Sequence, residues 1–162
     1  NKIYNVPVLA SVWLGALNTE WMIERGGVAA FEELAIRRSG LLYNLIDNSG
    51  GFYRTFVNKE ALRSRMQVVF TIRSGSGEDH ELVEKFLAEA NDDLGWLDIR
   101  SHPLGLPSDA IRVTMYNHQT EDTVRVVRDF MHQFQKRHDV QPQDSFDFGT
   151  LSMPSAGQPA AF

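Results

Sequence analysis

Arg112 is the residue whose position in the sequence points most clearly to ligand binding. Residues 111–116 alternate apolar and polar side chains, which predicts a strand with one apolar and one polar face. Arg112 belongs to the polar face, and a guanidinium on a rigid strand suits bidentate binding of a carboxylate or phosphate. A solvated or paired arginine on a sheet surface explains the pattern equally well. Arg100 and His102 precede this strand and are candidates to join Arg112 in an anion-binding cluster.

A weaker candidate is the loop Ser74-Gly75-Ser76-Gly77, between a predicted strand and a predicted helix. Backbone N–H groups at a helix start can bind phosphate. The loop lacks the third glycine of a dinucleotide fingerprint and the Gly-Lys-Ser/Thr of a P-loop. An ordinary connection between a strand and a helix is therefore the better interpretation.

Metal binding and hydrolase chemistry have no support in the sequence. The chain contains no Gly-x-Ser-x-Gly elbow and no cysteine, so cysteine-ligated zinc and disulfides are excluded. None of the histidines has HExxH or other compact metal-ligand spacing: His80, His102, His118, His132 and His138. We assign no metal site.

The composition is that of an ordinary globular protein of one domain. The 162 residues are 43% apolar and 23% charged, with a formal charge of -5. Mild acidity with scattered arginines argues against nucleic-acid binding. The longest apolar run, 6–17, is shorter than the roughly 20 residues of a membrane span. The chain has no initiator methionine and no signal peptide, so we expect a fragment, with the cytoplasm as the default compartment.

Hydrophobic periodicity predicts four helices and three strands. The second helix carries Gly40, and Asn117 is the expected cap of the last one. The order contains β-α-β-β-α, the bulk of a ferredoxin-like layer of helices on one face of an antiparallel or mixed sheet. The predicted elements are helix 7–25, helix 28–45, strand 65–73, a helix that carries apolar residues over 82–94, strand 96–100, strand 111–116 and helix 120–138.

The helix 7–25 is apolar on nearly all sides, so another domain or subunit must cover it. This separates two hypotheses. A free-standing ferredoxin-like module that binds a small anion or regulates a partner is one possibility, and Arg112 fits it. A piece of a larger enzyme is the other, and the first helix favours it.

Several runs, read in order over residues 4–138, resemble the C-terminal part of phosphoserine aminotransferases. The collinear set is more specific than any single run. The matching runs are Tyr4-Asn5-Val6-Pro7, Gly26-Gly27-Val28, Leu41-Leu42-Tyr43, Ile46-Asp47-Asn48-Ser49, Phe52-Tyr53-Arg54, Arg63-Ser64-Arg65-Met66-Gln67-Val68, Ile111-Arg112-Val113-Thr114-Met115-Tyr116-Asn117, Asp129-Phe130-Met131 and Lys136-Arg137-His138.

The resemblance implies the α/β (α+β) C-terminal domain of a fold-type I enzyme that depends on pyridoxal 5'-phosphate. A long N-terminal helix would precede a small antiparallel or mixed sheet with helices on one face. Residues 1–27 would connect to the large cofactor-binding domain, 28–138 would form the small domain, and 139–162 would be a disordered tail. The parent protein would be a homodimer with the cofactor site at its interface.

The resemblance also implies roles for particular residues. Asn5 matches the asparagine of an Asn-Thr-Pro motif that reaches the cofactor phosphate across the dimer, whereas Val6 replaces the threonine and lacks its hydroxyl. Arg112 matches the arginine that binds the substrate α-carboxylate. Arg100 and His102 are candidates for the pair that holds the substrate phosphate. The Schiff-base lysine would lie upstream of this chain, so we assign no catalytic residue here.

The activity implied is transfer of an amino group between L-phosphoserine and 2-oxoglutarate, which gives 3-phosphohydroxypyruvate and L-glutamate in serine biosynthesis. The chain shown would be inactive alone, because the residues that bind most of the cofactor would lie outside it. No nucleic acid or membrane is implied as a partner.

Overall fold

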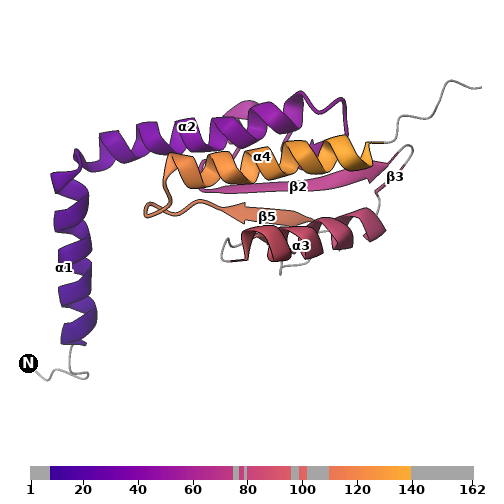
Figure 1. Cartoon of the computed structure of the whole chain (residues 1–162). Helices are drawn as coiled ribbons and strands as arrows, with labels where there is room; N and C mark the ends of the chain where they lie inside the picture. The colour runs from indigo at the N-terminus through magenta and orange to yellow at the C-terminus, as the bar shows by residue number, and fades with distance from the viewer. Residues whose placement is uncertain (1–7, 75–76, 79, 96–98, 102–109, 140–162) are drawn as a thin grey trace, which may run out of the picture.

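The computed structural model describes residues 8–74, 77–78, 80–95, 99–101 and 110–139. They form a layer of three helices on one face of an antiparallel sheet, with a fourth helix, α1, directed away from this body at one end (Figure 1). The helices are α1 (Leu9–Glu24), α2 (Gly27–Asp47), α3 (His80–Leu94) and α4 (Glu121–His138). The mixed α/β class predicted from the sequence is confirmed.

The sheet has the strand order β1-β2-β5-β4, and each neighbouring pair is antiparallel. Because β2 and β4 both run opposite to β5, they are parallel to each other, and α3 connects them as a split β-α-β unit. The strands are β1 (Tyr53–Thr55), β2 (Gln67–Ser74), β3 (Gly77–Glu78), β4 (Ile99–Ser101) and β5 (Ile111–Thr114), with a short 3-10 helix, η1 (Glu60–Leu62), between β1 and β2.

Two strands were missed by the sequence reasoning. β1 is three residues long and β3 is two, and segments this short show no periodicity. β3 also corrects the interpretation of residues 74–77 as a plain connection to a helix. Ser74 pairs with Gly77, so this segment closes a tight hairpin, while residues 75–76 lie outside the described residues.

The hydrophobic core lies between the helix layer and one face of the sheet. Phe86 of α3 is fully buried, and its ring packs edge-on against Phe70 of β2, with the centroids 5.9 Å apart. Phe130 and Phe134 of α4 contact the same ring at 5.2 Å and 5.0 Å. In the predicted strands 65–73 and 111–116, the apolar side is thus the side that faces the helices.

The last helix begins at Thr120, not at Asn117. The Thr120 hydroxyl accepts a hydrogen bond from the backbone N–H of Thr123 at 3.2 Å, which is the usual contact of an N-cap residue. Asn117 lies in the preceding turn, where Gln119 N–H donates to the Tyr116 carbonyl. The prediction of Asn117 as the cap was wrong because an exposed turn precedes the helix.

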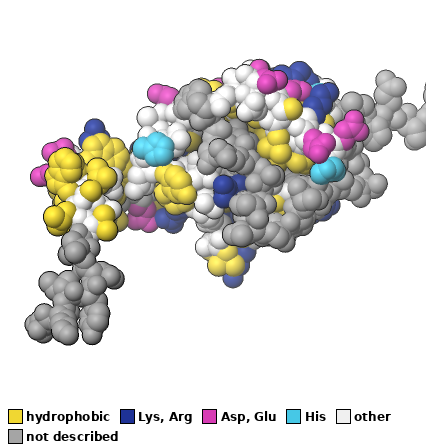
Figure 2. Space-filling view, turned by 90° about the horizontal axis from the view of Figure 1, so that it is seen from below, with side chains coloured by type: hydrophobic (Ala, Val, Ile, Leu, Met, Phe, Trp, Pro, Cys, Tyr) yellow, Lys and Arg dark blue, Asp and Glu magenta, His cyan; other side chains and the backbone are white. Residues whose placement is uncertain are grey.

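Helix α1 has no buried residue, although its side chains are mostly apolar. Figure 2 shows hydrophobic side chains gathered over it. The chain turns from α1 into α2 at Gly26 and Gly27, whose φ angles of 95° and 65° are left-handed and favour glycine. Only the last turns of α1 touch the body, where Trp21 packs on Phe31 with ring centroids 5.2 Å apart.

Candidate functional site

All four arginines of the sheet strands belong to the face opposite the helices, which we call the arginine face. It comprises Arg54 of β1, Arg73 of β2, Arg100 of β4 and Arg112 of β5. The register fixes this placement, because Arg54 pairs with Thr71, and Val69 pairs with Arg112. The alternate residues of β2 form the core. Burial of the apolar face therefore forces these arginines onto the other one.

Arg112 occupies the centre of the sheet, between β2 and β4. Its side chain is half-buried, and its Nε atom is buried without a hydrogen-bond partner. On the same face, the hydroxyls of Thr71 and Thr114 are also buried without a partner. Unpaired buried polar atoms are uncommon in proteins, so each one needs an explanation.

Arg100 is the register partner of Arg112 across β4 and β5. Two positive residues directly opposite each other destabilise a sheet, unless an anion lies between them. The backbone of Arg100 is described, but its side chain is not. His102 and Asn5, the other predicted site residues, and Val6 lie outside the described residues. Of these predicted site residues, the described part of the chain gives the position of Arg112 and the backbone pairing of Arg100.

Arg38 is a buried arginine that the sequence reasoning missed. It lies on α2 with no exposed surface, and its Nη1 donates to the carbonyls of Tyr116 at 2.8 Å and Gln119 at 2.5 Å. Burial lowers the pKa of this guanidinium. Arg38 thereby holds the turn that follows the strand of Arg112. The signal was present, since Arg38 falls in the stripe of Phe31, Ala35, Leu42 and Ile46 that α2 buries.

Several residues of the matching runs are structural. Arg63 forms a bidentate ion pair with Asp47, with Nη1 and Nη2 at 2.6 Å and 2.8 Å from the two carboxylate oxygens. The hydrogen bond to Asp47 raises the pKa of Arg63. The buried Ser49 hydroxyl accepts from the N–H of Tyr53, whose own hydroxyl donates to the Met131 carbonyl at 2.7 Å. These contacts tie β1 and its flanking segments to the helix layer.

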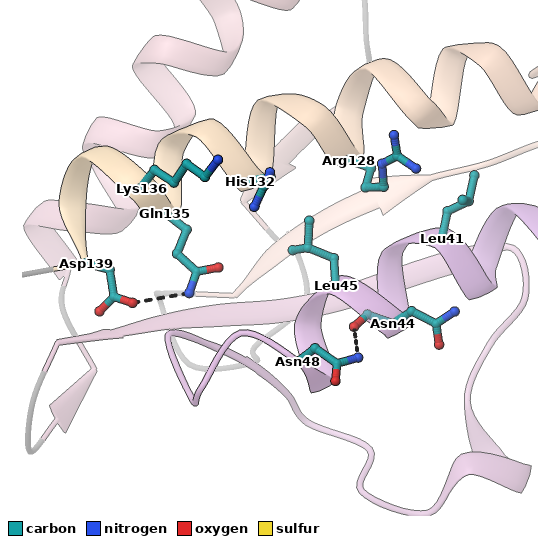
Figure 3. A pocket seen from close by; sticks show the side chains of 9 residues that line it. All are labelled: Leu41, Asn44, Leu45, Asn48, Arg128, His132, Gln135, Lys136 and Asp139. Carbon is teal, nitrogen blue, oxygen red and sulfur yellow. Dashed lines mark hydrogen bonds between the residues drawn. The ribbon is translucent and has the colours of Figure 1, made fainter. Parts of the chain in front are cut away.

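A groove of about 680 Å³ lies between α2 and α4 (Figure 3). The Gln135 amide donates to the Ser49 carbonyl at 2.8 Å and to the Asp139 carboxylate at 3.2 Å, and the Asn48 amide donates to the Asn44 carbonyl at 2.7 Å. These amide donors already have local partners. We therefore assign no ligand to this groove.

Neither a metal site nor an enclosed lysine is found in the described part of the chain. No three side chains among His, Asp and Glu there are grouped to hold an ion. Lys59, Lys85 and Lys136 are all exposed. No helix among the described residues is long and apolar enough to cross a membrane.

The fold and this site define a small α/β domain with a helix-covered face and an arginine-bearing face suited to anions. No family model matches the chain. It is 36% identical over 141 residues to a probable phosphoserine aminotransferase of Caenorhabditis elegans, and the aligned residues cover 86% of this chain and 36% of that protein. It is 35% identical over 138 residues to the phosphoserine aminotransferase of Geobacillus kaustophilus (strain HTA426), and the aligned residues cover 85% of this chain and 35% of that protein.

Solved structures agree. The phosphoserine aminotransferase of Bacillus circulans subsp. alkalophilus superimposes with a TM-score of 0.71 at 27% identity, over 83% of this chain and 34% of that one. A second phosphoserine aminotransferase structure, from a study of radiation damage to its Schiff base, gives 0.71 at 28%, over 83% and 35%.

The chain is thus a homologue of the phosphoserine aminotransferases, which are fold-type I enzymes that depend on pyridoxal phosphate, and it is consistent with their C-terminal portion. It spans about a third of the length of these relatives. The resemblance seen in the sequence is confirmed, and a free-standing regulatory module is not favoured.

Proposed function

We propose that the chain is the C-terminal part of a phosphoserine aminotransferase. The whole protein would transfer an amino group between L-phosphoserine and 2-oxoglutarate, in the cytoplasm and as part of serine biosynthesis. The observation that carries the proposal is the identity of about a third over 85% of the chain to proteins of that name. Arg112, half-buried on the arginine face with an unpaired Nε, supports it.

Arg112 is proposed to bind the substrate α-carboxylate. A bidentate guanidinium fixes both the position and the plane of a carboxylate. Holding the substrate in one orientation presents its α-hydrogen to a base in the missing part of the protein, so the contribution of Arg112 is orientation and not proton transfer. Arg38 supports this role through the turn after β5.

Arg100 and His102 are proposed to contribute to binding of the substrate phosphate. The register places Arg100 beside Arg112, and His102 follows β4 directly. Two anionic groups on one substrate would relieve the repulsion between paired arginines.

Pyridoxal 5'-phosphate is the proposed cofactor, and Asn5 is the residue of this chain proposed to contact its phosphate. The cofactor supplies an electron sink for a carbanion. The lysine that would form the Schiff base is proposed to lie in another part of the protein. This chain's own residues would bind and orient the substrate.

The domain division proposed is a connecting segment over 1–27, a small domain over 28–138 and a tail over 139–162. The exposed apolar side chains of α1 support a surface that the large domain and a second subunit would cover in a homodimer. On this basis the chain alone would be inactive and would associate.

The test is the visible absorption spectrum of the full natural polypeptide, recorded before and after addition of L-phosphoserine. A yellow protein whose band shifts on addition would support a working aminotransferase. A protein that stays colourless with added pyridoxal phosphate would show that the similarity to these enzymes extends to the fold and not to the activity.

A further inference from the structure

The groove between α2 and α4 takes no small ligand through its amides, yet its two walls differ in a way that suits a segment of chain. The α2 wall carries Leu41 and Leu45, which are half-buried and pack against the core. The α4 wall carries His132 and Lys136, which are both exposed (Figure 3). The groove therefore has an apolar strip beside a strip of basic side chains.

Two of the ionisable side chains in the groove have no partner. Arg128 binds the carboxylate of Asp129 through Nε at 2.9 Å and Nη2 at 2.6 Å, and the carboxylate of Asp139 accepts from a side-chain amide. In the part of the chain that the structure describes, no hydrogen bond, ion pair or ring contact involves the side chain of His132 or Lys136. Lys136 thus presents an unpaired positive charge next to the apolar strip.

Residues 140–162 have the opposite character. They begin directly after Asp139, which ends α4 and lines the groove, and they lie beyond the last run that resembles the aminotransferases. They contain two aspartates and no lysine, arginine or histidine, and both aspartates fall in the run Asp144-Ser145-Phe146-Asp147-Phe148. This run combines acidic groups with two large apolar side chains, so it is complementary to the groove.

The direction of the helices sets the order in which a returning tail meets the groove. Arg37 of α2 pairs with Glu121 near the start of α4, and Gln135 near the end of α4 donates to the Ser49 carbonyl after α2. The two helices therefore run parallel. A segment that turns back from the end of α4 passes Lys136 first and the two leucines of the apolar strip afterwards.

The spacing of the two partners agrees. Leu41 and Leu45 are separated by four residues of a helix, a rise of about 6 Å. Phe146 and Phe148 are separated by two residues, which span about 6.6 Å in an extended segment. Successive side chains on one side of an extended segment thus match successive turns of the helix.

The connection is long enough to make the return. Four residues, 140–143, separate Asp139 from Asp144, and they include Pro142, which favours a turn. Four extended residues reach about 13 Å. The distance back from Asp139 to Lys136 is less than one turn of α4, about 4.5 Å along the helix.

We infer that residues 144–148 of the chain's own tail dock in the groove between α2 and α4, antiparallel to α4. Asp144 pairs with Lys136, and the two phenylalanines cover the two leucines of the apolar strip. Five residues of the tail are then ordered, and the groove is closed to other partners. The inference does not rest on the proposed function, because the groove belongs to the helix layer and the arginine face is the other face of the sheet.

The experiment uses the full natural polypeptide shortened to end at Val140, which frees the groove, and a fluorescein-labelled peptide of residues 141–151. Fluorescence anisotropy measures binding of the peptide to the shortened protein and to the intact one. Lys136→Glu reverses the charge in the groove, and a peptide with Asp144→Lys restores opposite signs. Lys85→Glu is the matched control, because Lys85 is an exposed lysine of α3 that does not line the groove.

We expect the peptide to bind the shortened protein at least tenfold more tightly than the intact one, because the tethered tail competes for the groove. Lys136→Glu should weaken binding of the unchanged peptide about fivefold, and Asp144→Lys in the peptide should recover this loss. A peptide with serine at both phenylalanine positions should bind at least tenfold more weakly. Lys85→Glu should match the shortened parent protein.

A peptide that fails to bind the shortened protein, or that binds the shortened and intact proteins equally, would overturn the inference. Equal losses in Lys136→Glu and Lys85→Glu would also overturn it, since overall charge would then account for binding. If the intact protein takes up the peptide more tightly as it is diluted, the occupant of the groove is the tail of a second copy and not the chain's own. The peptide with two serines needs no change in the protein, so it tests the apolar strip even if Lys136→Glu misfolds.

Discussion

The two faces of the sheet differ in the kind of side chain that they bury. On the helix-covered face, apolar side chains from three helices and three strands fill one core, and Phe70 and Phe86 are completely buried. On the arginine face, buried polar atoms of Thr71, Thr114 and Arg112 have no partner, as is also true of Nε and Nη2 of Arg38 on α2. Burial of apolar surface stabilises the first face. The second carries polar groups that cost stability, and it is the face proposed to bind the substrate, so we expect stability and substrate binding to separate between the two faces.

The largest expected effect is on the helix-covered face. Phe86→Ala should lower the free energy of unfolding by about 3 to 5 kcal/mol, because it removes a ring packed against Phe70, Phe130 and Phe134 and leaves a cavity. Denaturant unfolding followed by circular dichroism measures it. A loss below about 1 kcal/mol would show that the neighbouring core side chains can fill the cavity left by the Phe86 ring.

Arg112→Ala tests the opposite face. It should weaken amino-acid substrate binding by about 2 to 4 kcal/mol through the loss of a charge-assisted bidentate contact. Cofactor loading and unfolding midpoint should stay close to those of the parent protein, because Arg112 makes no hydrogen bond with the described residues through its buried Nε. Substrate titration of the full natural polypeptide provides the measurement. A lowered unfolding midpoint with unchanged substrate binding would show that Arg112 contributes to stability and not to binding.

Thr120→Ala is expected to destabilise the helix layer by about 1 kcal/mol, since it removes the hydroxyl that accepts from the Thr123 N–H. Thr120→Ser keeps the hydroxyl and is the matched control. Chemical denaturation of the two variants should place serine near the parent protein and alanine below it. Equal stabilities would show that solvent replaces the cap.

The smallest effect concerns pH. Burial raises the pKa of Glu89, but hydrogen bonds and charge from Arg137 and His138 outweigh it and hold the pKa below its ordinary value of 4.5. A lowered pKa in the folded state gives stability that is present above about pH 4.5 and is lost as the pH falls below it. Glu89→Gln should flatten this part of the stability curve. The measurement is thermal unfolding between pH 3 and 6. If Glu89→Gln loses as much stability at low pH as the parent protein does, the role of Glu89 is contradicted.

The long periodic elements were predictable from the sequence. Residues 65–73 and 111–116 alternate regularly, and both became neighbouring strands of the sheet, β2 and β5. The helix 120–138 was also found, because its apolar spacing is strong. The short strands and the true cap were not, since two or three residues carry no periodic signal and a turn can displace a cap by a few positions.

The candidate site was predictable only in part. Alternation placed Arg112 on the polar face of a strand, and the resemblance gave it a carboxylate to bind. Arg54 lies in a strand too short to recognise, so its place on the same face depended on the pairing of β1 with β2. The apolar stripe of α2 signalled the burial of Arg38, but its partners, the carbonyls of Tyr116 and Gln119, lie about 80 residues further along the chain, so only the tertiary structure shows them.

The sequence by itself determined the kinship of this protein, the order of its main elements and which face of each long strand turns inward, because apolar periodicity and collinear runs are local properties of the chain. The tertiary structure decided that the arginines of four strands share one face. Strand register is a property of pairing between distant segments, and burial of the opposite face is the force that sets it.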